Sequence, residues 1–107
     1  MADRVSDILV VESVRSVALV FQGWIRKLGL RTDIVDEGES GLEKLRTGQF
    51  NLAVIDLDLE GISGLEILKT ARQENIHTNF IVVTTNGSVN LAVEAMRLGA
   101  HDFLIKP

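Results

Sequence analysis

Four polar residues with complementary chemistry each follow a short apolar run in this sequence. Glu12 comes after ILVV, Asp56 after LAVI, Thr84 after FIVV and Lys106 after FLI. A carboxylate can act as a nucleophile toward a phosphoryl group, and a hydroxyl and an ammonium can hold the phosphoryl oxygens. A second carboxylate can help to bind Mg²⁺. Together these residue types predict phosphoryl-transfer chemistry, provided that the fold brings them to one place.

The elements that must position these residues alternate between strands and helices. Strands are predicted over residues 8–11, 31–35, 52–55, 80–83 and 102–105, and helices over 14–28, 39–47, 64–73 and 89–98. Ser63 and Ser88 are expected to cap the third and fourth helices. The alternation predicts a doubly wound α/β fold, with a mostly parallel sheet and helices on both faces.

Parallel strands end at one edge of their sheet, so the four polar residues are expected to converge there. Each of them alone has an ordinary explanation, because polar residues are common where a strand enters a loop. Four of them at successive strand ends favour a functional site at this edge.

The apolar patterns of two helices carry further expectations. In helix 14–28 the inward stripe is predicted to be Val17, Phe21, Trp24 and Leu28, and Gly41 is expected to weaken helix 39–47. Helix 89–98 has two apolar stripes, whereas a helix with one buried side needs only one. The surplus favours a surface for a partner. The stripes are Val89, Ala92, Val93 and Met96, and Leu91, Ala95 and Leu98.

Composition limits the class of protein. A chain of 107 residues, 46% of them apolar, forms one domain with a real core. Its net charge of −4 argues against nucleic acid or an anionic membrane as a direct partner. The absence of cysteine excludes disulfides and thiolate chemistry. Because no membrane span or signal peptide is evident, a cytoplasmic location is expected.

Over essentially its whole length, the chain resembles the response-regulator receiver domain of two-component signalling. The matching segments are ILVV with Glu12, VIDLDLEGISG, IVVTT and AVEAMRLGAHDFLIKP. The last segment is especially similar to receivers of NtrC-like enhancer-binding transcription regulators, including the LuxO type. The resemblance implies a CheY-like, five-stranded parallel sheet of order 2-1-3-4-5.

The resemblance also implies a role for each site residue. Asp56 would accept the phosphoryl group, and Glu12 would belong to the acidic pair that binds Mg²⁺. Asp58 would give its backbone carbonyl to the metal, and Thr84 and Lys106 would contact the phosphoryl group. Phe103 takes the aromatic switch position. A cis bond between Lys106 and Pro107 is implied as well.

The partners that the resemblance implies are a sensor histidine kinase or a histidine phosphotransfer protein, and an attached output domain. For NtrC-like regulators that output is an ATPase with a DNA-binding module. A homodimer through the fourth helix and fifth strand is also implied. Since the chain stops at Pro107 without the closing fifth helix, we expect it to be a fragment of a longer regulator.

Three departures from the family pattern matter. Ser13 stands where a second metal-binding acid is usual, Glu60 where proline is usual, and Thr85 where a small residue is usual. A neutral hydroxyl is a poorer Mg²⁺ ligand than a carboxylate. We therefore expect a weakened Mg²⁺ site, with the Asp58 or Glu60 side chain supplying part of the missing charge.

Two alternatives stay open at this point. The first is a degenerate receiver that works by docking without phosphorylation, because Ser13 replaces a metal-binding acid. The second is a phosphatase, because Asp56-Leu57-Asp58 is similar to the aspartate motif of haloacid-dehalogenase-like phosphohydrolases. Those enzymes place the motif on their first strand and need a larger core, which makes the phosphatase the more distant alternative.

Overall fold

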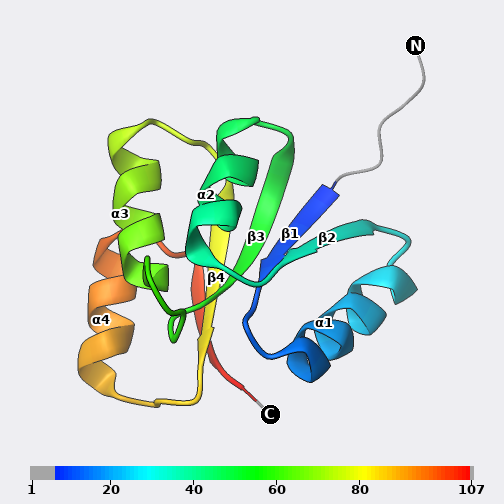
Figure 1. Ribbon diagram of the computed structural model, residues 1–107. Coiled ribbons are helices and arrows are strands. Elements are labelled where there is room, and N and C mark those ends of the chain that lie inside the picture. Colours follow the sequence, from blue (N-terminus) through cyan, green and yellow to red (C-terminus); the bar gives the residue numbers. More distant parts are fainter. Residues whose placement is uncertain (1–6, 107) are drawn as a thin grey trace.

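Five parallel strands form the centre of the fold, in the order β2-β1-β3-β4-β5 (Figure 1). This computed structural model describes residues 7–106. The predicted cis bond between Lys106 and Pro107 lies outside the described residues. The strands are β1 (Asp7–Val11), β2 (Arg31–Val35), β3 (Phe50–Asp56), β4 (Asn79–Thr84) and β5 (Asp102–Ile105). The helices are α1 (Arg15–Lys27), α2 (Gly38–Arg46), α3 (Gly64–Gln73) and α4 (Val89–Arg97). The predicted fold class and strand order are confirmed, and the fifth helix is absent from the described residues.

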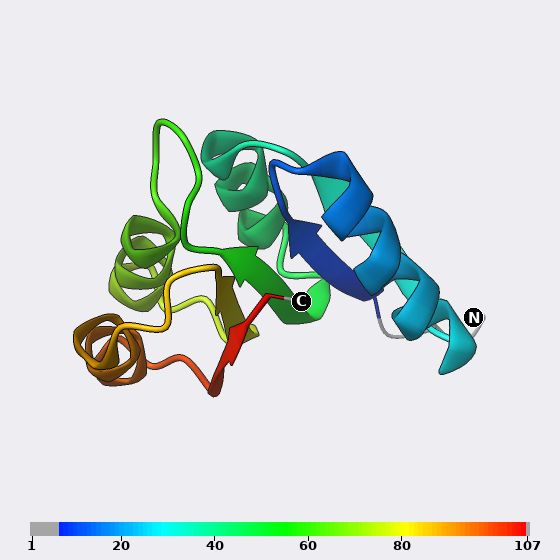
Figure 2. The same ribbon diagram turned by 90° about the horizontal axis from the view of Figure 1, so that it is seen from below.

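The helices divide between the two faces of the sheet (Figure 2). Helix α1 packs on one face, where Ala18, Phe21 and Ile25 contact apolar residues of β1, β3 and β4. Helices α2, α3 and α4 cover the other face. Because β1 and β3 are covered on both faces, their sequences are continuous apolar runs rather than alternating ones. No helix within residues 7–106 is long and apolar enough to cross a membrane.

The buried stripe of α1 differs from the one that the sequence predicts. Trp24 and Leu28 are 53% and 74% exposed, whereas Ala18, Phe21 and Ile25 are buried. The predicted stripe is therefore wrong at these two positions. The side of the helix that faces the sheet carries Ala18 and Ile25, each one residue from a predicted position, because these side chains fill the space against the sheet. Trp24 still packs edge-to-face against Phe21, with ring centroids 5.8 Å apart.

Local capping sets where α3 and α4 begin. The Ser63 hydroxyl accepts from the Glu66 amide, and the Glu66 carboxylate accepts from the Ser63 amide, which makes a capping box. The Ser88 hydroxyl accepts from the Leu91 amide at the start of α4. Both predicted N-caps are confirmed, so the sequence alone locates these two helix starts.

Gly41 is a packing requirement of α2. A Cβ atom at this position would lie 2.8 Å from a methyl carbon of Val11, closer than side chains approach. The absence of a side chain lets α2 lie directly against β1. The prediction that Gly41 weakens the helix rests on helix propensity, which takes no account of what the helix packs on, and it stays a prediction.

The register of the strands brings the polar strand ends together. Val11 pairs with Ile55, Asp56 pairs with Val83, and Thr84 pairs with Ile105. Glu12 and Lys106 each follow their strand by one residue. All four polar residues therefore lie at the carboxyl edge of β1, β3, β4 and β5, as parallel pairing predicts.

Candidate functional site

Two carboxylates and one ammonium form a buried cluster at the carboxyl edge of the sheet. Lys106 Nζ lies 2.9 Å from Glu12 Oε1 and 3.0 Å from Asp56 Oδ2. It also donates a hydrogen bond to Glu12 Oε2 at 2.9 Å. The side chains of Glu12, Asp56 and Lys106 are 0%, 1% and 5% exposed. The register thus joins residues from β1, β3 and β5, as the sequence predicts.

Asp56 is held by the backbone that follows it. The Asp58 amide donates to Asp56 Oδ1 at 2.9 Å, and the Leu57 amide donates to the Val83 carbonyl of β4. The loop then folds back so closely that a Cβ atom on Gly64 would lie 2.5 Å from the Asp56 carbonyl oxygen. Glycine at position 64 is therefore required for the loop to hold Asp56 at the sheet edge.

Burial and charge shift the proton affinities of the cluster in a consistent direction. Burial raises the pKa of Glu12, and the neighbouring Asp56 carboxylate raises it further, against the opposing effect of Lys106. Burial would lower the pKa of Lys106, but its contacts with Glu12 and Asp56 outweigh this and raise the pKa. Lys106 is therefore a permanent cation here. It is the charge that allows two carboxylates to lie side by side.

Thr84 is buried at the same edge, but its hydroxyl does not point to Asp56. It donates to Asp58 Oδ2 at 3.0 Å and accepts from the Asn86 amide at 3.1 Å. Thr85 also reaches Asp58 Oδ2, through its amide and its hydroxyl, both at 3.5 Å. The family resemblance implies that Asp58 acts through its backbone carbonyl, and the structure shows that its side chain accepts hydrogen bonds from Thr84 and Thr85, a contact that no local sequence pattern signals.

The remaining predicted site residues lie at the margin of the cluster. Ser13 and Glu60 are exposed, and both line an open cavity of about 350 Å³ beside the site, together with Asp58. Phe103 is half-buried and packs against the core on the face of α2, α3 and α4. The structure thus brings Glu12, Asp56 and Lys106 together and leaves Ser13 and Glu60 outside the buried cluster.

Two buried carboxylate oxygens of the cluster are of the kind that binds Mg²⁺. Glu12 Oε1 and Asp56 Oδ2 are buried without a hydrogen bond of good geometry, although Lys106 Nζ is nearby, and such oxygens suit a cation. Mg²⁺ commonly uses one or two carboxylates and keeps several waters. Within residues 7–106, however, no three acidic, histidine or cysteine side chains gather closely enough to hold a metal ion. Ser13 adds a neutral hydroxyl only.

The Asp58 side chain does not supply the missing charge to this cluster in the observed arrangement. Its Oδ2 accepts from Thr84 and Thr85. Glu60 is exposed on the rim of the neighbouring cavity. The expectation that one of the two carboxylates compensates for Ser13 stays a prediction that only a metal titration can test.

The amino-acid sequence of this chain is similar to those of known regulatory proteins. The sequence profile described as "Response regulator receiver domain" matches residues 8–107. The luminescence regulatory protein LuxO of Vibrio campbellii is 36% identical over 97 residues, which are 91% of this chain and 21% of that protein. The transcriptional regulatory protein ZraR of Klebsiella oxytoca is 36% identical over 107 residues, which are 100% of this chain and 24% of that protein. The chain thus spans about a fifth to a quarter of the length of these relatives.

Solved structures agree with these similarities. The signal receiver domain of a LuxO-type repressor protein from Vibrio parahaemolyticus superposes with a TM-score of 0.92 at 31% identity, covering 97% of this chain and 80% of that one. A CheY-like response regulator receiver domain protein from Methanospirillum hungatei gives a TM-score of 0.89 at 26% identity, covering 97% and 83%. The sheet and its helices therefore have the arrangement of these domains.

Proposed function

The chain belongs to the response-regulator receiver family, and on this basis we propose that it is a phosphorylation-controlled switch with Asp56 as the phospho-acceptor. Receiver domains are in general signalling domains of two-component systems rather than enzymes. The observation that carries the proposal is the buried cluster in which Lys106 contacts both Asp56 and Glu12 within 3.0 Å. Such a cluster places a carboxylate nucleophile beside a fixed positive charge.

The chemical step that this cluster supports is transfer from a phosphohistidine. A carboxylate oxygen of Asp56 attacks phosphorus, the P–N bond breaks, and its electron pair stays on the donor imidazole, which takes up a proton. Lys106 faces the negative charge that gathers on the phosphoryl oxygens. Receiver domains typically bind Mg²⁺ at this site. In this chain Glu12, Asp56 and the Asp58 backbone carbonyl would hold the ion, which neutralises phosphoryl charge when bound. We propose that the chain catalyses this step on itself.

The switch follows from the charge that phosphorylation adds. A phosphoryl group brings about −1.5 to −2 charges and three strong acceptor oxygens. Lys106 already contacts Asp56, and the Thr84 hydroxyl, buried at the same sheet edge, is the donor that would have to turn from Asp58 toward a phosphoryl group on Asp56. Movement of Thr84 toward the phosphoryl group, with Phe103 turning further inward, would reshape α4 and β5. A local charge change of this kind is sufficient to bias a two-state element.

The proposed partners of this chain follow from the family to which it belongs. Receivers of LuxO- and ZraR-type regulators work with histidine kinases and carry output domains. We propose that this chain is the receiver of such a regulator, that it works in the cytoplasm with a kinase or phosphotransfer protein, and that its output is transcriptional.

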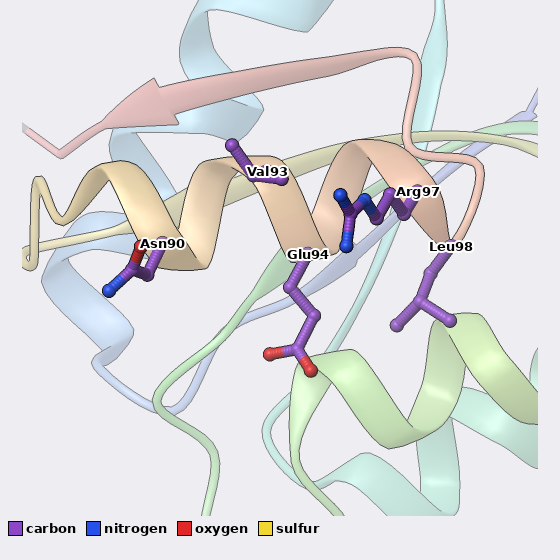
Figure 3. Close-up of a pocket in the computed structure, with 5 residues that line it drawn as sticks. All are labelled: Asn90, Val93, Glu94, Arg97 and Leu98. Atoms are coloured by element: carbon purple, nitrogen blue, oxygen red, sulfur yellow. The ribbon is translucent and has the colours of Figure 1, made fainter.

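A homodimer through α4 and β5 is the arrangement that the exposed apolar residues favour. Val89, Val93, Met96 and Ile105 are between 43% and 75% exposed. Figure 3 shows Val93 on the side of α4 toward β5, whereas Glu94 and Leu98 extend toward α3. Glu94 and Arg97 lie one turn apart on the open surface of α4. A two-fold axis at this surface would bring opposite charges and apolar side chains into contact, because it pairs the same patch on both copies.

A degenerate receiver is the second candidate, and Ser13 is the observation that favours it. Without an acid at this position the cluster has only two carboxylates for a metal, and Lys106 already contacts both. The phosphatase alternative has no comparable support, because the match to receivers spans residues 8–107.

Mass spectrometry after treatment with a small phosphodonor and Mg²⁺ tests the proposal. We expect the wild type to gain the mass of one phosphoryl group, Asp56→Asn to gain none, and Ser13→Asp to react at lower Mg²⁺ concentration than the wild type. A wild type that gains no mass while Ser13→Asp does would establish the degenerate receiver. A mass gain that persists in Asp56→Asn would show that another residue is the acceptor.

A further inference from the structure

One oxygen of the Asp58 side chain accepts hydrogen bonds from two consecutive residues, Thr84 at the end of β4 and Thr85 after it. Asp58 Oδ2 accepts from the Thr84 hydroxyl at 3.0 Å, and lies 3.5 Å from both the amide and the hydroxyl of Thr85. Thr84 is fully buried, whereas Asp58 is exposed. A solvent-accessible carboxylate therefore fixes the rotamer of a buried hydroxyl next to the phospho-acceptor.

These hydrogen bonds continue without a gap to the start of α4. The Asn86 amide donates to Thr84 Oγ1 at 3.1 Å, and the Ser88 amide donates to Asn86 Oδ1 at 2.9 Å. The Leu91 amide in turn donates to the Ser88 hydroxyl that caps α4. A change at Thr84 therefore reaches the first turn of α4 through two side chains only.

We propose that Asp58 is a positioning residue that holds Thr84 in its resting orientation and competes with the phosphoryl group for the Thr84 hydroxyl proton. A hydroxyl has one proton, so a strong hydrogen bond to one anion excludes an equal one to another. Both competitors are negatively charged, and hydrogen bonds to charged groups are the stronger kind. The competition rests on the proposed phosphorylation of Asp56, but the resting contact does not.

The competition has a direct structural consequence. When Thr84 turns to the phosphoryl oxygens, Asp58 loses the shortest of its hydrogen bonds to this segment and Thr84 Oγ1 moves away from the Asn86 amide. The loop from Thr85 to Ser88 is then held less firmly, and the N-cap of α4 loses its support. Asp58 thus sets how much free energy phosphorylation must supply before α4 rearranges, in addition to any movement of Phe103.

The resting contact is tested without phosphodonor or metal, by amide hydrogen exchange measured residue by residue with NMR. In Asp58→Ala we expect the Asn86 and Ser88 amides to exchange at least about fivefold faster, because the acceptor that orders the loop is gone. Asp58→Asn keeps an acceptor oxygen and should restore most of the protection. Glu60→Ala removes an equal charge from the same loop, from a side chain with no hydrogen bond to Thr84, and serves as the matched control. Equal exchange in Asp58→Ala and Glu60→Ala would overturn the inference.

The competition itself is tested by the affinity for beryllofluoride, a phosphoryl analogue, in the presence of Mg²⁺. At saturating Mg²⁺, Asp58→Ala is expected to bind beryllofluoride about tenfold more tightly than the wild type, since breaking a hydrogen bond to a charged group no longer opposes binding. In a Thr84→Ala background the gain from Asp58→Ala should vanish, as a double-mutant cycle requires. An equal gain in both backgrounds would reduce the effect to simple charge removal and overturn the competition.

The two experiments separate this inference from the proposed function. If the wild type binds no beryllofluoride, the proposed role of Asp56 fails, and the exchange measurement still decides whether Asp58 orders Thr84 and the loop. If beryllofluoride binds but Asp58→Ala changes neither exchange relative to Glu60→Ala nor affinity relative to the wild type, the proposed function stands and the inference fails.

Discussion

At the scale of single residues, the centre of this protein is a buried group of three charges. An ion pair at the surface, such as that between Arg46 and Glu74, contributes little because water screens it. The contacts of Lys106 with Glu12 and Asp56 are different, since the three side chains are at most 5% exposed. Removing one partner of a buried pair typically costs about 3–5 kcal/mol, because the remaining charge is left uncompensated. Stability and the proposed function therefore depend on the same side chains.

The raised pKa of Glu12 predicts how stability changes with pH. Its usual value is 4.5, and burial raises it in the folded chain. As pH increases above 4.5, the unfolded chain loses this proton first, so the contribution of Glu12 to stability is present below 4.5 and is lost as pH rises through the raised value. Glu12→Gln has no ionisable group at this position, so its stability does not decrease with pH for this reason. We expect the free energy of unfolding of Glu12→Gln to rise relative to wild type as pH increases from 4.5 through the raised pKa of Glu12.

Urea unfolding at a series of pH values, without added metal, measures this difference. Glu60→Gln removes one carboxylate from an exposed position and controls for the change in net charge. A difference between Glu12→Gln and wild type that stays constant with pH would contradict the raised pKa.

At the scale of elements, close backbone approaches decide how the loops hold the site. The loop after β3 returns over Asp56, and only glycine fits at position 64. Helix α3 then reaches α4 through Arg72, whose guanidinium donates to the carbonyls of Leu98 and Gly99. The loop that carries Asp58 and the helix proposed as the output surface are therefore parts of one connected layer.

Gly64→Ala tests the close approach at the site. The new Cβ would meet the Asp56 carbonyl oxygen at 2.5 Å and the Leu57 Cα at 2.8 Å, and neither backbone atom can move without shifting the acceptor. We expect a loss of about 1–3 kcal/mol in the free energy of unfolding, as overpacking usually costs.

A glycine in α1 supplies the matched control for this substitution. Around Gly23 a Cβ would meet nothing within 4 Å. Gly23→Ala should therefore stabilise the chain by about 0.5–1 kcal/mol, since alanine favours a helix interior. Urea denaturation compares the two variants with wild type, and a stable Gly64→Ala would refute the packing argument.

At the scale of the whole molecule, apolar side chains remain exposed on both layers of the fold. On α4 and β5 they include Val93 and Ile105, and on α1 they include Val20 and Trp24. Exposed apolar patches of this kind often mark interaction surfaces. The proposed dimer uses the α4–β5 surface, and the α1 surface offers a comparison.

Two valines with equal exposure make the dimer testable. Val93 on α4 and Val20 on α1 are each 43% exposed. Val93→Glu is expected to lower the dimer fraction of the beryllofluoride-treated chain several-fold, because it buries a charge at the proposed interface. Val20→Glu should leave the fraction unchanged. Sedimentation velocity measures both, and equal loss in the two variants would count against an α4–β5 interface.

Local residue patterns are enough to define the elements and the edge at which the site lies. Ile8–Val11 and Leu52–Ile55 are apolar runs that only doubly covered strands require, and alternation with helical patterns implies parallel pairing. The amino-acid sequence therefore assigns Glu12, Asp56 and Lys106 to one edge, with Thr84 beside them. It can do so because periodicity and capping are local properties of the chain.

Which atoms meet at that edge depends on the tertiary structure alone. Lys106 contacts Glu12 across 94 positions of the chain, and the Asp58 carboxylate takes the Thr84 hydroxyl 26 positions away. Packing also turns Trp24 outward and sets Gly41 against β1. Local patterns do not encode these facts, because rotamers and helix rotation are set by packing between distant segments. That packing joins three of the four strand ends in a buried charge cluster and directs the fourth, Thr84, to the Asp58 carboxylate.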